Sequence, residues 1–187
     1  MEMNEVERLE RDVQQAIRTR LENERKDKKD QKRWLIGTAL LLLFIFLLFR
    51  VFFGMAVVEG SSMVPNYQDS DLVLFARIHG ALKRGDVVLA RVDDGRVLIK
   101  RVVGLPGEEV YIDERTGIVV IDGEEQAEEY AQGVTRRSAI QEYPITLGED
   151  EYFLMGDNRE NSMDSRDYGP ISLADIEGKV LAILRKN

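Results

Sequence analysis

One serine and one lysine could carry covalent chemistry in this sequence. Ser62 follows Gly60 and precedes Met63-Val64-Pro65, and Lys100 lies 38 residues later in the apolar run Val97–Val103. A lysine amine without its extra proton can take one from a serine hydroxyl, which turns the hydroxyl into a nucleophile. The pair therefore predicts nucleophilic catalysis with Ser62 as nucleophile and Lys100 as general base.

The segment around Ser62 suits that role because it is stiff. Gly60 lets the backbone approach a substrate closely, and Pro65 holds the residue before it extended. The Ser62 N–H is a natural donor to an oxyanion. Serines beside glycine and proline also fill ordinary turns, so an ordinary turn is the alternative for this motif alone.

Lys100 is expected to point into the core. Alternate side chains of a strand share a face, which places Lys100 with the apolar Leu98 and Val102. Burial disfavours the ammonium form and lowers the pKa of a lysine. The alternative is an edge-strand lysine whose amine reaches water.

A long polar turn, residues 156–170, is the third candidate segment. Within it Asp164 and Arg166 could pair, and Ser162 could hydrogen-bond a neutral Lys100 amine and orient it. The alternative is a surface loop with a solvated ion pair, which stabilises a fold by about 0–1 kcal/mol.

Residues 1–33 hold ten Lys/Arg and nine Asp/Glu. The apolar residues Val6, Leu9, Val13, Ile17 and Leu21 recur at helical spacing, which predicts a charged amphipathic helix. Such a helix could pair with a partner helix, lie on a membrane, or remain solvated.

Residues 34–58 are apolar apart from Arg50 and Gly/Thr positions, and they are long enough to span a bilayer. The basic cluster before Trp34 predicts a cytoplasmic N-terminus, with residues 59–187 outside the membrane. A cleaved signal peptide and a buried helix are the alternatives. The charged leader is far longer and more acidic than the n-region of an ordinary signal peptide, which argues against the first alternative, and the all-round apolar surface argues against the second.

From residue 59 onward, short apolar runs alternate with turn signals, which predicts a mainly β domain. Ser172–Glu177 is expected to be a short helix with Ser172 as N-cap, and Glu124–Tyr130 a helix or loop. The predicted strands are Leu72–Ala76, Val87–Val92, Val97–Val103, Glu109–Ile112, Ile118–Ile121, Tyr152–Met155 and Val180–Leu184.

Composition excludes several classes of function. The net charge of −8 disfavours a nucleic-acid partner, and the lack of cysteine excludes thiol chemistry and disulfides. A Ser-His-Asp hydrolase would need His79, which lies in a turn-like segment. Glu124, Glu125, Glu128 and Glu129 have no histidine beside them, so neither a metal nor a cofactor is expected.

Four segments together resemble bacterial type I signal peptidase, in its Gram-positive form, in order and spacing across residues 57–171. They are Gly60–Pro65, Gly85–Val88, Ile99–Gly107 and Gly156–Arg166. The resemblance implies that Ser62 attacks the peptide bond after a secretory signal peptide. It also implies that Lys100 is the general base and later protonates the leaving amine.

Further roles follow from the resemblance. Ser162 would help position Lys100, Asp164 and Arg166 would support that loop, and Gly60 would add only backbone to the oxyanion hole. Asp86 and Arg101 would be structural. The implied fold is a largely antiparallel, barrel-like β-sheet domain whose apolar surface touches the membrane, and the implied substrates are preproteins with small residues at positions −1 and −3.

Two residues depart from the family pattern, at positions that bear on the pockets. Asn66 replaces the usual threonine, and Leu98 replaces a common aromatic residue. Two rival functions remain, a soluble Ser-Lys self-cleaving repressor and a non-enzymatic anchored assembly factor. The membrane segment argues against the first, and the presence of both Ser62 and Lys100 argues against the second.

Overall fold

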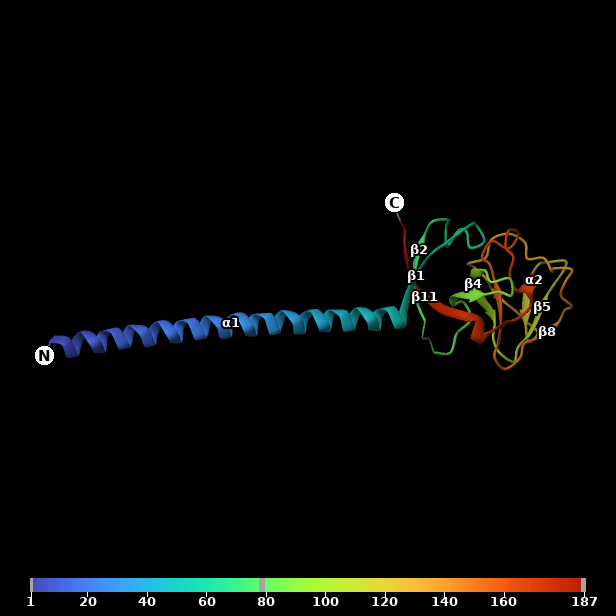
Figure 1. Cartoon of the computed structure of the whole chain (residues 1–187). Helices are drawn as coiled ribbons and strands as arrows, with labels where there is room; N and C mark the ends of the chain where they lie inside the picture. Colours follow the sequence, from blue (N-terminus) through green and yellow to red (C-terminus); the bar gives the residue numbers. More distant parts are fainter. Residues whose placement is uncertain (1, 78–79, 186–187) are drawn as a thin grey trace. The chain divides into compact units, whose positions relative to one another are not determined.

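A computed structural model describes residues 2–77 and 80–185, without the side chains of residues 2–7 and 22. The chain divides into two compact units, residues 1–49 and residues 50–187. Helix α1 (Glu2–Phe52) accounts for the described part of the first unit and ends three residues into the second, which is built mainly of strands (Figure 1).

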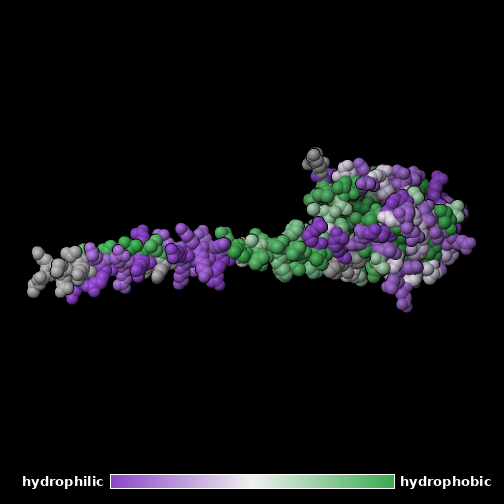
Figure 2. All heavy atoms as spheres, viewed as in Figure 1, coloured by the Kyte–Doolittle hydropathy of each residue, from purple (hydrophilic) through white to green (hydrophobic). Residues whose placement is uncertain are grey.

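Helix α1 has a charged half followed by an apolar half (Figure 2). Its interior contains no proline, so nothing in the sequence interrupts the hydrogen-bonded ladder. The side chains from Leu40 to Phe49 are all exposed, and the helix is long and apolar enough to cross a membrane. It ends at Phe52, and residues 53–57 of the predicted anchor instead form a strand.

Two sheets make up the second unit. The seven-stranded sheet has the order β1-β2-β11-β3-β4-β9-β10, and the four-stranded sheet has the order β7-β6-β5-β8. Every pairing between these strands is antiparallel, which confirms the expected mainly β, antiparallel fold. The strands are β1 (Phe53–Val57), β2 (Leu72–Ala76), β3 (Val87–Arg91), β4 (Val97–Gly104), β5 (Glu109–Ile112), β6 (Val119–Ile121), β7 (Glu124–Glu125), β8 (Ile145–Thr146), β9 (Glu151–Met155), β10 (Ile171–Ser172) and β11 (Ile176–Leu184).

Strand β4 lies inside the larger sheet, between β3 and β9. Val103 on β4 and Phe153 on β9 share a buried apolar cluster with Val110 and Ile112 of the smaller sheet. A separate cluster contains Met63, Val73 and Ile99. The strand that carries Lys100 is therefore fixed by hydrogen bonds on both edges and by packing on its faces.

The C-terminal helix prediction was partly wrong. Ser172 does cap a helix, accepting a hydrogen bond from the Ala174 N–H, but that helix is a single 3-10 turn, η1 (Leu173–Asp175). Strand β11 begins at Ile176 because this buried residue pairs with Ala90 of β3. In the acidic segment from residue 124 to 130, the first two residues form the short strand β7 and the rest is irregular.

Candidate active site

The loop that presents Ser62 leaves β1 and returns to β2. The Val58 N–H donates to the Asp71 carbonyl at 2.8 Å, and the Ser70 N–H donates to the Val58 carbonyl at 2.8 Å, which closes the loop at its base. Met63 is 1% exposed, so its side chain anchors the loop in the core. Ser62, the residue before it, is consequently held half-buried at the surface of the sheet.

Lys100 lies on β4 and is 4% exposed. Its neighbours on the same strand face, Leu98 and Val102, pack in an apolar cluster, as the alternation of residues predicted. Burial lowers the Lys100 pKa to about 8, while the nearby Asp164 carboxylate partly opposes this shift. At pH 7 about one-tenth of such lysines are therefore neutral, compared with fewer than about one in a thousand for an exposed lysine.

The two side chains meet. The Lys100 Nζ lies 2.8 Å from the Ser62 Oγ and 3.0 Å from the Ile99 carbonyl oxygen. The Ser62 backbone N–H has no hydrogen-bond partner among the described residues, so it is available to a substrate. This arrangement allows the amine to take the hydroxyl proton as the Ser62 oxygen attacks a carbonyl carbon. The backbone N–H can then donate to the oxyanion that forms on the attacked carbonyl.

Asp164 and Arg166 form a buried ion pair behind Lys100, with an Nε–Oδ1 distance of 2.8 Å. Burial opposes ionisation of Asp164, but the hydrogen bonds and charge of Arg166 outweigh it and hold the Asp164 pKa below its usual value. Asp164 also caps the short helix α2 (Ser165–Tyr168). Ser162 donates to the Asp164 Oδ2 at 2.7 Å, and no hydrogen bond joins it to Lys100 in the described part of the chain.

Two glycines have defined parts in this loop arrangement. Gly60 has a φ of +83°, which favours glycine, and its N–H donates to the Asp69 carboxylate at 2.8 Å. At Gly156, an added Cβ would lie 2.2 Å from the Ser162 Oγ and 2.5 Å from the Ser62 carbonyl oxygen. Gly156 therefore permits the Ser162 loop and the Ser62 loop to lie against each other.

A second network, which the sequence reasoning missed, connects the Ser62 loop to the strand of Lys100. The Asn66 side-chain amide donates to the Asp157 carboxylate at 2.8 Å and to the Tyr130 carbonyl at 2.9 Å. Asp157 is fully buried and accepts two hydrogen bonds from Arg101, the neighbour of Lys100. In the sequence Asn66 stands out only as a departure from the family pattern, because its partners lie 64 and 91 residues away.

A pocket of about 280 Å³ opens beside the pair and contains both Ser62 and Lys100 in its wall. Its remaining lining is apolar apart from Glu59, and consists of Ala56, Val57, Val58, Val73, Leu89, Val97, Leu98 and Ile99. The lining of this pocket suits apolar side chains next to the Ser62 hydroxyl.

The other predicted residues lie outside this constellation. Asp86, just before β3, forms an ion pair at 2.8 Å with Lys179 of the neighbouring strand β11. His79 lies outside the described residues.

Comparison with known proteins gives a consistent result. The model of the family "signal peptidase, peptidase S26" matches residues 31–184. Signal peptidase I P of Bacillus subtilis subsp. natto is 30% identical over 169 residues, which cover 84% of this chain and 90% of that protein. Signal peptidase I of Bacillus licheniformis is 34% identical over 152 residues, which cover 75% and 81%.

Among solved structures, a signal peptidase I from Enterococcus faecalis V583 is similar to 56% of this chain over its own full length, with 29% identity and a TM-score of 0.45. The extent of the family match and the identity to curated relatives decide the assignment. This chain belongs to the signal peptidase family, peptidase S26, whose members are serine endopeptidases that remove signal peptides from secretory preproteins.

Proposed function

We propose that Ser62 is the nucleophile and Lys100 the general base of signal-peptide cleavage in this protein. The observation that carries the proposal is the 2.8 Å contact between the Ser62 Oγ and the Lys100 Nζ, with the amine buried and its pKa lowered to about 8. A general base whose pKa lies near the working pH is partly neutral at that pH, and it still binds a proton strongly enough to take one from the serine hydroxyl.

The reaction follows from these two groups. Lys100 takes the Ser62 proton as the hydroxyl oxygen attacks the carbonyl carbon before the scissile bond, and the Ser62 N–H stabilises the oxyanion. Lys100 then gives that proton to the leaving amine of the mature protein. In the second half, Lys100 takes a proton from water, the resulting hydroxide attacks the ester carbon, and the proton returns to Ser62.

We further propose that preproteins with small residues at −1 and −3 fill the apolar pocket. In an extended peptide, alternate side chains point the same way, so the −1 and −3 residues face one surface together. The pocket volume of about 280 Å³ must then serve two side chains, which favours small ones.

Ser162, Asp164 and Arg166 are proposed to set the position and charge around Lys100 rather than to touch substrate. The buried Asp164 carboxylate favours the protonated lysine, and Arg166 opposes it. The Ser162 hydroxyl donates a hydrogen bond of 2.7 Å to the Asp164 carboxylate, which holds the orientation of that carboxylate near Lys100. Gly60 is proposed to contribute only the shape of the backbone before the oxyanion site.

The N-terminal unit is proposed to be a single-pass anchor with residues 1–33 cytoplasmic and the catalytic domain, from residue 59, outside. The apolar stretch from Trp34 to the end of α1 at Phe52 has 19 residues, which rise about 28 Å at ~1.5 Å each, close to the ~30 Å hydrocarbon core. Arg50 lies within one turn of the helix end, where its side chain can reach the interface.

The test is processing of a secretory preprotein by the purified full chain in detergent. Wild type should release the mature protein, and Ser62→Ala should not. Processing by Ser62→Ala at the wild-type rate would exclude Ser62 as the nucleophile. No feature of the structure favours the non-enzymatic alternative.

A further inference from the structure

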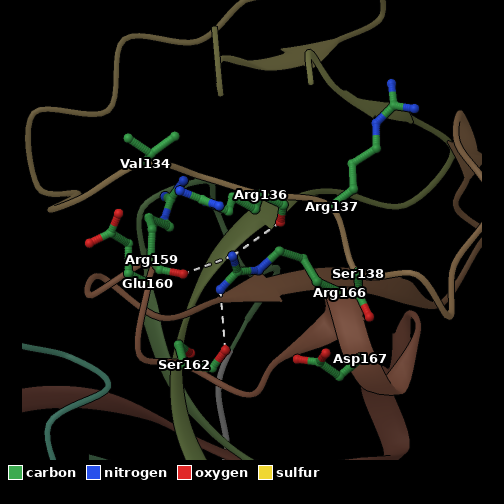
Figure 3. Close-up of a pocket in the computed structure, with 9 residues that line it drawn as sticks. All are labelled: Val134, Arg136, Arg137, Ser138, Arg159, Glu160, Ser162, Arg166 and Asp167. Carbon is green, nitrogen blue, oxygen red and sulfur yellow. Dashed lines mark hydrogen bonds between the residues drawn. The ribbon is translucent and has the colours of Figure 1, made fainter. Parts of the chain in front are cut away.

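A second cavity, of about 430 Å³, has Ser162 in its wall and shares no lining residue with the apolar pocket. In contrast to the apolar pocket, this cavity is lined mainly by charged and polar side chains, including arginines and acidic residues (Figure 3). Arg136, Glu160 and Ser162 are among its lining residues, and buried Arg159 and Arg166 form its floor.

This polar cavity begins next to the nucleophile's backbone. Ser162 lies in its wall, and across Gly156 the Ser162 hydroxyl neighbours the Ser62 carbonyl. The same loop is tied to the nucleophile's loop by three hydrogen bonds, which are Asn158 N to Ser62 O at 2.9 Å, Asn158 Nδ2 to Ser61 O at 3.1 Å and Asn161 Nδ2 to Ser61 Oγ at 2.7 Å. These bonds hold the wall of the polar cavity against the loop that carries the nucleophile.

The two arginines of the floor, Arg159 and Arg166, already have hydrogen-bond partners within the protein. Arg159 pairs with Glu128 through two hydrogen bonds of 2.6 and 2.7 Å. Arg166 donates to the Asp164 carboxylate. It also donates to the carbonyl oxygens of Arg136, Arg159 and Ser162 (Figure 3). These two guanidinium groups have little capacity left for a ligand.

Arg136 and Glu160 differ from the floor residues because both are exposed. Within the described ranges, neither side chain takes part in a hydrogen bond or an ion pair. Among the residues that the structure describes, the Arg136 and Glu160 side chains of this cavity therefore have no partner, whereas the buried Arg159 and Arg166 are already paired with acidic side chains. A charged, extended segment would find partners for both there.

We propose that this polar cavity binds the first residues of the mature protein, on the carboxyl side of the scissile bond, and that Arg136 favours an acidic side chain there while Glu160 favours a basic one. The inference rests on the proposed role of Ser62 as nucleophile. The two cavities then divide the substrate by chemistry, with small apolar residues before the cleaved bond and polar or charged residues after it.

The experiment compares kcat/KM of the full chain in detergent for matched preprotein peptides. The peptides differ only at one position from +2 to +5, where each carries glutamate, lysine or alanine. At the position that reaches Arg136, Arg136→Glu should lower the glutamate-to-lysine ratio by about fivefold, and Glu160→Lys should raise the ratio at its own position similarly. The control is Lys83→Glu, an exposed residue that lines neither cavity and makes the same charge change, and it should leave all ratios unchanged.

A glutamate-to-lysine ratio that Arg136→Glu and Glu160→Lys leave unaltered at every position would overturn the proposal, and so would an equal change in Lys83→Glu. If Arg136→Glu does not fold, Arg136→Gln should still lower the ratio, by up to about fivefold. Failure of the proposed function is separable, because it would appear as cleavage by Ser62→Ala, whatever residues follow the bond.

Discussion

Lys100 has opposite consequences for catalysis and for stability. Its folded pKa of about 8 lies below the ordinary 10.5 because burial disfavours the ammonium. Between these two pH values the unfolded chain binds more protons, so this lysine's penalty on folding is full below pH 8 and fades as pH rises toward 10.5. A group that costs stability and is retained is typical of an active site.

Lys100→Met should therefore abolish cleavage while raising the free energy of unfolding by about 1–3 kcal/mol at pH 7. The gain should shrink as pH rises from 8 toward 10.5. Thermal unfolding in detergent, followed by circular dichroism at several pH values, measures it, with exposed Lys83→Met as control. A variant that is both inactive and less stable than wild type at pH 7 would point to a structural role for Lys100.

Leu98 lines both the apolar pocket and a neighbouring cavity of about 10 Å³, and Lys100 borders both spaces as well. We expect the Leu98 side chain to limit the depth of the pocket in this protein. Leu98→Ala should join the two spaces, admit larger residues at −1 or −3, and destabilise the fold by about 2 kcal/mol. The measurement is kcat/KM for peptides with alanine or leucine at these positions. An unchanged preference would show that Leu98 does not limit the pocket.

At the scale of elements, the catalytic distance depends on how the Ser62 loop is attached to β4. Asn66 provides one such attachment through Asp157, which Arg101 also binds. The carboxylate retains Arg101 if Asn66 is removed, so the core should survive while the loop gains freedom.

Asn66→Ala should accordingly lower kcat about ten- to hundredfold with a smaller effect on KM. Asn66→Asp should be worse, because it brings a second carboxylate beside the buried Asp157. Gln68→Ala, an exposed change on the same loop, is the matched control. Equal kcat in Asn66→Ala and wild type would mean that this attachment does not position Ser62.

The sequence predicted strands well where the local residue pattern was typical of a strand and nothing else. Leu72–Ala76 and Glu109–Ile112 match β2 and β5 residue for residue, because each is a short run of β-prone apolar residues bounded by turn signals. Strand β1 was missed because its apolar residues continue the anchor without a break, and only pairing with β2 distinguishes them. The Asn66 network also escaped, because hydrogen bonds between distant residues leave no local periodicity.

At the scale of the whole molecule, the proposed topology makes a simple prediction. The apolar part of α1 should keep the protein in the membrane fraction after carbonate extraction, because lipid solvates its exposed side chains. Protease added outside intact cells should degrade the domain from residue 59 onward and leave the leader, residues 1–33, intact. Loss of the leader instead would reverse the orientation.

The most direct test of the Ser62–Lys100 mechanism is the pH dependence of kcat/KM for a cleavable preprotein peptide, measured with the full chain in detergent. Because only the neutral amine accepts the serine proton, activity should rise about tenfold per pH unit below pH 8 and level off above it. A rate that stays constant from about pH 5 to pH 9 would contradict a buried lysine acting as the general base.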